Sequence, residues 1–271
     1  EISLGLVGSE MCIRDRLIDG SSFLFRAFHA VPSLNRSDGT PVNAVLGFTN
    51  MLMKFLGDTH ATHLAVIFDS ARKTFRNEIS ADYKANRPEP PDELLPQFPL
   101  VRDATRAFNV PCIEKLGYEA DDLIATYARK ANAEGVKVTI VSSVKDLMQL
   151  VNKKTKMYDA MKNIYIGINE VKEKFSVDPS KLIDLQALAG DSIDNIPGVS
   201  GIGIKTAAEL INNFGSLENL MSKLEEIKQP KRKQALIDEQ DNALISKKLA
   251  TLKKDVPLIK SYNFQLFKGI N

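Results

Sequence analysis

The alternation of strand-like and helix-like segments predicts an α/β protein with a parallel sheet, followed by a small helical domain. Leu64 to Phe68 and Val136 to Val141 are short apolar runs rich in β-branched residues, which is typical of strands buried on both faces. Helical spacing lies between them, over Val101 to Phe108 and Asp121 to Ala133. We therefore expect strands and helices to alternate around one sheet.

Two domains are predicted, because strand signals fade after Ser176 and helical spacing then dominates. We expect an α/β domain over residues 17–180 and an all-helical domain over residues 181–271. The segment of about residues 72–93 is polar, carries prolines and is basic at its centre. This composition is typical of a mobile loop or a helical arch that faces phosphate.

The two ends of the chain differ from the rest of the sequence. Arg14, Asp15 and Arg16 stand immediately before Leu17, where a central strand should be apolar. The stretch EISLGLVGSEMCIRDR resembles a translated sequencing adapter, so we predict that residues 1–16 are foreign. The chain ends in KSYNFQLFKGIN, which completes no element, and we expect the natural protein to continue.

The composition is that of a globular protein without a membrane span. Of the 271 residues, 44% are hydrophobic, which suffices for a substantial core. No apolar run approaches the roughly 18 residues that a span needs, and we expect no secretory leader. Cys12 and Cys112 are too few for a disulfide framework and lack zinc-site spacing. We therefore expect a cytoplasmic protein with no membrane partner.

The net charge of +2 does not by itself indicate nucleic-acid binding, but charges of opposite sign are separated along the chain. Acidic residues gather beside apolar runs at places where buried carboxylates are costly. The acids in question are Asp19, Asp69, Glu119, Asp121, Asp122, Asp146, Asp191 and Asp194. Any one of them could be a solvated charge or a helix cap. As a set they need cations between them.

The chemistry of these acids indicates Mg²⁺, with Mn²⁺ as a substitute. The set contains no histidine or cysteine, and all-oxygen ligands favour Mg²⁺ or Mn²⁺ over zinc. We assign His29, His60 and His63 to packing or the surface, and no Ser, His and Asp order favours a hydrolase triad. Two such ions can activate a water and stabilise the leaving oxygen in phosphodiester hydrolysis.

A glycine-rich turn, GVSGIGIKTA, precedes a predicted helix and indicates a phosphate-binding hairpin. Gly201 and Gly203 would let backbone N–H groups approach a phosphate, and Lys205 and Thr206 would add direct contacts. The spacing of a nucleotide-binding P-loop is absent, and no strand precedes the turn. The alternative is an ordinary turn between helices.

The centre of the 72–93 segment offers a third, weaker signal. Tyr83, Lys84 and Arg87 combine an aromatic side chain with cations that could steer a single strand and neutralise its phosphates. The alternative is a solvated surface loop.

These residues occur in the order LIDGSSFLFRAFHA, VIFDS, YKANRPEPP, GYEADDLIAT, SSVKDLMQLV and GDSIDNIPGVSGIGIKTA. This order resembles the 5′ nuclease family, represented by the 5′ to 3′ exonuclease domain of bacterial DNA polymerase I and by phage and archaeal flap endonucleases. The resemblance runs from Leu17 to about Leu258. It implies a PIN-like parallel-sheet nuclease domain and a helix-hairpin-helix-type domain that binds duplex DNA, commonly with K⁺.

The resemblance also implies a role for each matching residue. The eight acids named above would bind metal, and Lys84 and Arg87 at the base of the arch would stabilise the scissile phosphate. Arg26 and Tyr83 would guide the 5′ strand. The residues that would hold the duplex are Gly201, Gly203, Lys205 and Thr206.

Two positions depart from the family pattern. Where the family reads SSDKDL this chain reads SSVKDL, so Val144 replaces an aspartate expected to help hold the metals. We expect reduced activity, or activity recovered only at high metal or with Mn²⁺. Ile204 replaces a residue that is often polar in the family.

The sequence therefore predicts a monomeric, structure-specific 5′ nuclease of the bacterial cytoplasm, which removes 5′ flaps and RNA primers in replication and repair. Its partner would be DNA with a 5′ flap, a nick or a free 5′ end, and a polymerase domain could follow residue 271. One alternative is a branched-DNA-binding protein whose catalysis is impaired by Val144. Another is a metal-stabilised domain unrelated to nucleic acid.

Overall fold

The computed structural model describes residues 14–57 and 63–258, and within them a six-stranded sheet has the order β3-β2-β1-β4-β5-β6. Neighbouring strands are parallel except for β6, which is antiparallel to β5. The strands are β1 (Arg14–Asp19), β2 (His63–Ile67), β3 (Cys112–Ile113), β4 (Lys137–Val141), β5 (Thr155–Asp159) and β6 (Ile164–Ile166). His60, residues 1–13 of the predicted foreign segment and the terminal stretch 259–271 lie outside the described residues.

The central strand β1 begins inside the stretch predicted to be foreign. Its Asp15 is buried, and Asp15 Oδ1 lies 2.9 Å from Nδ1 of His63, the first residue of β2. A buried acid is tolerated in this strand because the neighbouring strand supplies a polar partner. Residues 14–16 are therefore part of the described sheet, although a uniformly apolar strand was expected.

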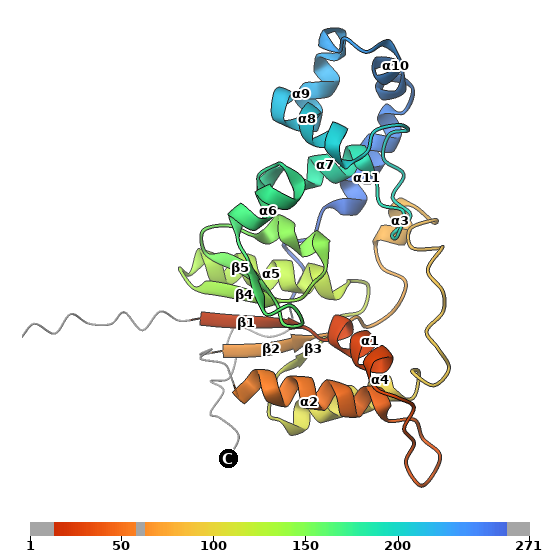
Figure 1. Cartoon of the computed structure of the whole chain (residues 1–271), viewed down its shortest axis with the longest axis vertical. Coiled ribbons are helices and arrows are strands. Elements are labelled where there is room, and N and C mark those ends of the chain that lie inside the picture. The colour runs from red at the N-terminus through yellow and green to blue at the C-terminus, as the bar shows by residue number, and fades with distance from the viewer. Residues whose placement is uncertain (1–13, 58–62, 259–271) are drawn as a thin grey trace, which may run out of the picture.

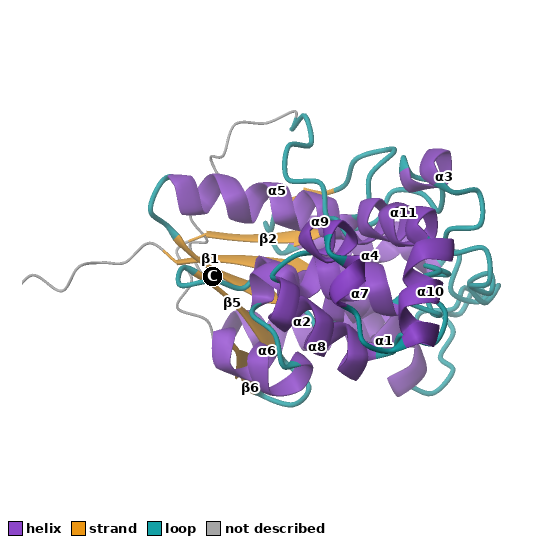
Figure 2. Cartoon of the chain, turned by 90° about the horizontal axis from the view of Figure 1, so that it is seen from above, coloured by secondary structure: helices purple, strands orange, loops and turns teal. Residues whose placement is uncertain are grey.

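Helices cover both faces of the sheet (Figures 1 and 2). Along β2 the side chains alternate between the faces, as strand geometry requires. Leu64, Val66 and Phe68 belong to the apolar cluster formed with α1, α2 and α4, whereas Ala65 and Ile67 belong to the cluster formed with α5. The helices of this domain are α1 (Gly20–Ala30), α2 (Asn43–Gly57), α3 (Arg76–Ile79), α4 (Gln97–Ala107), α5 (Ala120–Ala133), the short helix η1 (Lys145–Leu150) and α6 (Ile168–Phe175).

A helical domain follows, and it shares the core of the sheet domain. Leu123 of α5, Leu147 of η1, Leu185 of α7 and Leu210 of α8 belong to one continuous apolar cluster. The elements are η2 (Pro179–Lys181), α7 (Leu182–Ala189), α8 (Ile204–Phe214), α9 (Leu217–Ser222), η3 (Leu224–Glu226), α10 (Pro230–Asp238) and α11 (Gln240–Ala250). The predicted fold class, a parallel-sheet α/β domain followed by a helical domain, is confirmed.

The segment expected to form a loop or arch consists of α3 followed by turns, and it packs on the connection between α7 and α8. The N–H of Lys84 donates to the Asp194 carbonyl at 2.9 Å, and Asn195 Nδ2 donates to the Asp82 carbonyl at 2.7 Å. This packing joins the basic centre of the segment to the loop that carries two of the predicted acids. Among the helices of the described residues, none has the length and apolar character needed to cross a membrane.

Candidate active site

A cavity of about 580 Å³ opens where β1 and β2 end. Asp19 is the last residue of β1, and Asp69 follows β2. Parallel sheets place their sites at this edge because the connections leaving the strands diverge there. Six of the eight predicted acids line the cavity: Asp19, Asp69, Glu119, Asp121, Asp146 and Asp194.

The first acid group consists of Asp19, Asp69, Glu119 and Asp121. Asp19 caps α1, and its Oδ1 accepts the N–H of Ser22 at 2.9 Å while its Oδ2 accepts Oγ–H of Ser142 at 2.8 Å. Burial raises the pKa of Asp19 to about 6 against the lowering effect of these two hydrogen bonds, and the charge of Asp69 adds to the rise.

The beginning of α5 carries the other half of this group. The N–H of Ala120 donates to Asp69 Oδ1 at 2.8 Å, which fixes the helix terminus against the strand end. Burial raises the pKa of Asp121 well above its ordinary range, and the negative charges of the other three acids of the group raise it further. Mutually repelling carboxylates of this kind are stabilised when a divalent cation lies between them.

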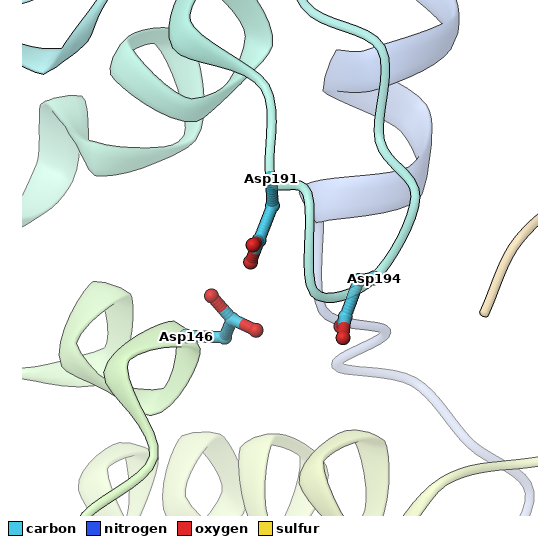
Figure 3. Close-up of side chains that lie close together, drawn as sticks. All are labelled: Asp146, Asp191 and Asp194. Atoms are coloured by element: carbon cyan, nitrogen blue, oxygen red, sulfur yellow. The ribbon is translucent and has the colours of Figure 1, made fainter. Parts of the chain in front are cut away.

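The second acid group consists of Asp146, Asp191 and Asp194, whose ligand atoms lie within 4.8 Å of one another (Figure 3). Asp146 comes from η1, and the other two come from the connection between α7 and α8. Burial raises the pKa of Asp146, and the charges of Asp194 and Asp191 raise it further. Three carboxylates from two domains are therefore arranged as an all-oxygen cation site.

The loop that carries Asp191 and Asp194 is closed by a contact between two glycines. A Cβ on Gly198 would lie 2.4 Å from the backbone nitrogen of Gly190, and the φ of Gly198 is +65°. Asp191 and Ile196 form an antiparallel bridge within the loop. Gly198 is thus required for closing this loop, a role that differs from the phosphate approach expected from its place in the glycine-rich motif.

Asp122 does not join the other predicted metal ligands. It is 0% exposed, and its two carboxylate oxygens accept Arg76 Nη1–H at 2.7 Å and Nη2–H at 2.8 Å. The same oxygens accept the N–H groups of Glu119 at 3.2 Å and Lys253 at 2.9 Å. With its oxygens occupied away from the cavity, Asp122 holds the structure beside the first acid group.

The cations Lys84 and Arg87 line the cavity and contact both acid groups. Lys84 Nζ lies 2.8 Å from Glu119 Oε1 and 3.8 Å from Asp194 Oδ2, and Arg87 pairs with Asp194. Against the opposing effect of burial, these two acids raise the pKa of Lys84. Lys84 also has a φ of +56°, a left-handed conformation that is uncommon for lysine and that is often found at functional sites.

Arg26 and Tyr83 occupy different environments, although both were expected to guide a strand. Arg26 lines the cavity, and its Nη2 donates to Ser143 Oγ at 2.6 Å. Tyr83 is 5% exposed and its hydroxyl donates to Glu119 Oε2 at 3.3 Å, so it does not present the open aromatic face that was expected. His29, which was assigned to packing or the surface, is exposed and also borders the cavity.

The glycine hairpin lies in the helical domain, at the beginning of α8. Gly203 precedes the helix, Gly201 has a φ of +74°, and a Cβ on either would meet open space. Lys205 is exposed and Thr206 is partly exposed. The hairpin thus offers accessible backbone and a helix N-terminus, which together favour an anionic ligand.

Sequence reasoning missed several residues that shape the site. Lys145 Nζ lies 2.8 Å from Asp191 Oδ2, Gln186 donates to Asp146, and Ser142 supports Asp19. Only Ser142 had a visible signal, because it directly follows the strand-like run that became β4. Val144 lines the cavity, at the position where the family pattern has an aspartate.

Two family models match the chain. The model described as "5′-3′ exonuclease, N-terminal resolvase-like domain" matches residues 15–176, and the model described as "5′-3′ exonuclease, C-terminal SAM fold" matches residues 177–268. The chain therefore belongs to the 5′-3′ exonuclease family, as its motifs imply.

Curated relatives include bacterial DNA polymerase I proteins and a 5′-3′ exonuclease. The chain is 57% identical over 250 residues to the DNA polymerase I of Rhizobium leguminosarum, which covers 89% of this chain and 25% of that protein. It is 42% identical over 209 residues to the 5′-3′ exonuclease of Aquifex aeolicus, covering 77% of this chain and 72% of the relative. The chain thus spans about a quarter of the length of this DNA polymerase I.

Solved structures with the same fold come from bacteriophage T5. The T5 5′-exonuclease with bound zinc ions superposes with a TM-score of 0.76 at 24% identity and covers 89% of this chain and 90% of its own. The T5 flap endonuclease in complex with DNA and metal ions gives a TM-score of 0.74 at 24% identity, covering 89% of each chain. At this identity the likeness concerns the fold.

Proposed function

We propose that this protein is a Mg²⁺-dependent 5′ nuclease that hydrolyses phosphodiester bonds in branched DNA near a free 5′ end. The observation that carries the proposal is the convergence of two acid groups and two cations on one cavity at the end of the parallel sheet. Family membership supports the reaction class, and the T5 flap endonuclease has been solved in complex with DNA and metal ions.

The donor set fits divalent metal ions. All candidate ligands are carboxylate oxygens, and those of the second group are close enough to share one ion. Burial is the main cause of the raised pKa values of Asp19 and Asp121, and the negative charges of neighbouring acids raise both pKa values further. Mg²⁺ fits this chemistry, and Mn²⁺ is expected to replace it.

Each part of the site would have a distinct task in hydrolysis. Bound divalent ions supply an activated water and neutralise charge on the leaving oxygen. The first and second acid groups would hold one ion each. Lys84 and Arg87 would exchange their contacts with Glu119 and Asp194 for the scissile phosphate, where a guanidinium can donate two parallel hydrogen bonds.

The helical domain would hold the duplex while the cavity receives the 5′ strand. Gly201 and Gly203 leave backbone accessible to a phosphate, and Lys205 adds a positive charge at the beginning of α8. The family resemblance also implies a K⁺ ion at this hairpin. Arg26 of α1 lines the cavity and would contact the strand that enters it.

Neither the fold nor the comparisons supports the alternative of a DNA-binding protein with impaired catalysis. Val144 removes one carboxylate from the family pattern, but Asp146, Asp191 and Asp194 still converge beside it. We propose that these three are sufficient for activity, with a higher metal requirement.

The wider setting follows from the relatives. Because the chain corresponds to a quarter of a bacterial DNA polymerase I, we propose that this nuclease acts alongside a linked polymerase domain in replication and repair. We also propose that it acts as a monomer in the bacterial cytoplasm.

A panel of 5′-labelled DNA substrates tests the proposal. The protein is incubated with Mg²⁺ and a 5′ flap, a nicked duplex, a blunt duplex or a single strand of the same sequence. We expect cleavage near the junction of the flap and slower release from the nick. Equal cleavage of all four substrates would contradict structure specificity, and cleavage of none would contradict the nuclease.

A further inference from the structure

Residues 249–256, here called the return strap, lead from the end of α11 in the helical domain back along the α/β domain (Figure 1). The strap lies beside α5, since Thr126 of that helix accepts the N–H of Val256 at 3.2 Å through its Oγ1. It is distant in sequence from the acids of the cavity. Its hydrogen-bond partners are nevertheless residues that neighbour these acids.

One set of contacts joins the strap to α3 and to the beginning of α5. Arg76 Nε donates to the Leu249 carbonyl at 2.9 Å, and Arg76 Nη2 donates to the Thr251 carbonyl at 3.1 Å. Asp122 Oδ1 accepts the N–H of Lys253 at 2.9 Å. Arg76 and Asp122 are 1% and 0% exposed, so water is not an alternative partner for these groups.

A second set of contacts joins the strap to η1. Gln149 Nε2 donates to the Ala250 carbonyl at 3.0 Å, and Gln149 Oε1 accepts the N–H of Leu252 at 3.2 Å. Both sets involve the main chain of the strap. These hydrogen bonds are made by the backbone of the strap, while its side chains Leu249, Leu252 and Val256 are buried in the apolar clusters.

The residues that receive the strap are close neighbours of the candidate metal ligands. Asp122 follows Asp121 directly, and its Oδ2 accepts the N–H of Glu119 at 3.2 Å. Arg76 Nη1 lies 3.6 Å from Glu119 Oε2. Gln149 lies one turn after Asp146 in η1. A shift of the strap would leave buried polar groups unpaired unless the beginning of α5 and the helix η1 shifted with it.

We propose that the return strap positions both acid groups for metal binding, so that Arg76, Asp122 and Gln149 are positioning residues for the cleavage reaction. The inference rests on the proposed function for its catalytic part. It assigns a role in the chemistry of the cavity to a segment that comprises the last two residues of α11 and the six residues that follow them. Partners of this kind, one step removed from a metal, typically change metal affinity or activity by about 10–100-fold when they are replaced.

Two single variants remove strap contacts, and the second is compared with a control that loses the same lysine charge. Gln149→Leu removes both hydrogen bonds to the strap, and Lys253→Pro removes the N–H that Asp122 accepts. Lys253→Ala is the matched control because it keeps that N–H. The double variant Arg76→Met with Asp122→Leu replaces the buried ion pair by apolar side chains, so that no single buried charge is left without its partner.

Three quantities are measured for each variant: Mn²⁺ binding by electron paramagnetic resonance, thermal unfolding in EDTA, and the single-turnover rate on a 5′ flap. We expect Gln149→Leu and the double variant to weaken Mn²⁺ binding and slow cleavage by roughly ten-fold or more, with flap affinity nearly unchanged. Lys253→Pro should behave like them and Lys253→Ala like the parent.

Unchanged Mn²⁺ binding in folded Gln149→Leu and in the folded double variant would overturn the proposal. The proposal would also be overturned if Mn²⁺ binding and the cleavage rate fell only in proportion to the fraction of each variant that is unfolded. If the parent binds Mn²⁺ but cleaves no flap, the proposed function fails, while the Mn²⁺ measurement still decides whether the strap positions the acids.

Discussion

Asp19 is buried at the end of the central strand, and its ionisation opposes folding. Its pKa of about 6 in the folded protein exceeds the ordinary value of 3.8, chiefly because of burial. Between these two values the folded state binds more protons than the unfolded state. The stability contributed by Asp19 is therefore greatest below the ordinary value and is lost as pH rises towards about 6.

Asp19→Asn isolates this effect because asparagine does not titrate. Between about pH 4 and about pH 7, without divalent metal, the free energy of unfolding of the parent should fall relative to Asp19→Asn by up to about 3 kcal/mol. Urea unfolding of both proteins across this range measures the difference. Parallel pH profiles would show that Asp19 titrates normally. Mg²⁺ should restore stability to the parent at the higher pH, since it binds only the folded state.

Val144 lines the cavity beside Asp146, so a carboxylate at this position would add a negative charge to the metal site. Val144→Asp should lower the Mg²⁺ concentration needed for half-maximal cleavage several-fold and should destabilise the metal-free protein by like-charge repulsion. Val144→Asn, of the same size but without charge, is the control. An unchanged metal requirement and rate in Val144→Asp would contradict the account of this position.

At the scale of elements, two glycines of one motif serve different purposes. Gly198 lies against the backbone of Gly190 and closes the loop of the second acid group, whereas Gly203 faces open space before α8. Gly198→Ala should therefore destabilise the fold by about 1–3 kcal/mol or more, because its φ is positive and its Cβ would meet backbone.

Gly203→Ala should leave the free energy of unfolding nearly unchanged and weaken duplex binding several-fold, because a methyl group would then stand where a phosphate must approach the backbone. Urea unfolding and binding to a labelled duplex separate the two effects. Undiminished duplex binding by folded Gly203→Ala would mean that the hairpin is an ordinary turn.

The sequence predicted those elements whose hydrophobic residues follow a regular strand or helix spacing. The apolar runs that became β2 and β4, and the helical spacing of α5, have strong periodic signals, and strand ends located Asp19 and Asp69. The beginning of β1 was not predictable, because its buried Asp15 depends on His63, which is remote in sequence.

In the candidate site, too, the sequence did not predict the residues whose position depends on partners that are distant in the chain. The sequence placed Asp122 in the same set of predicted metal ligands as Glu119, but its partner Arg76 comes from another element and holds it away from the cavity. Tyr83 lies in a polar, proline-bearing segment that suggests exposure, yet it packs with Ile196 and Leu249 in a small apolar cluster. Such pairings between distant segments are decided by the tertiary fold and leave no periodic signal in the sequence.

At the scale of the whole molecule, the cavity depends on both domains. The sheet domain supplies the first acid group and Asp146, while the connection between α7 and α8 supplies Asp191 and Asp194. The arch segment and the return strap each join the two domains again through hydrogen bonds. The arrangement of the acids therefore depends on how the two domains are joined.

Two-metal hydrolysis at this cavity is tested by single-turnover cleavage of a 5′-labelled flap across a Mg²⁺ and Mn²⁺ series, with Asp121→Asn as the matched variant. Asp121 lines the cavity, and asparagine has nearly the same size and shape as aspartate but carries no charge. Metal-dependent release of short 5′ products by the parent, with a loss of roughly a hundred-fold or more in Asp121→Asn, is the result that two-metal catalysis predicts. Flap binding without cleavage at every metal concentration, or equal rates for parent and variant, would contradict it.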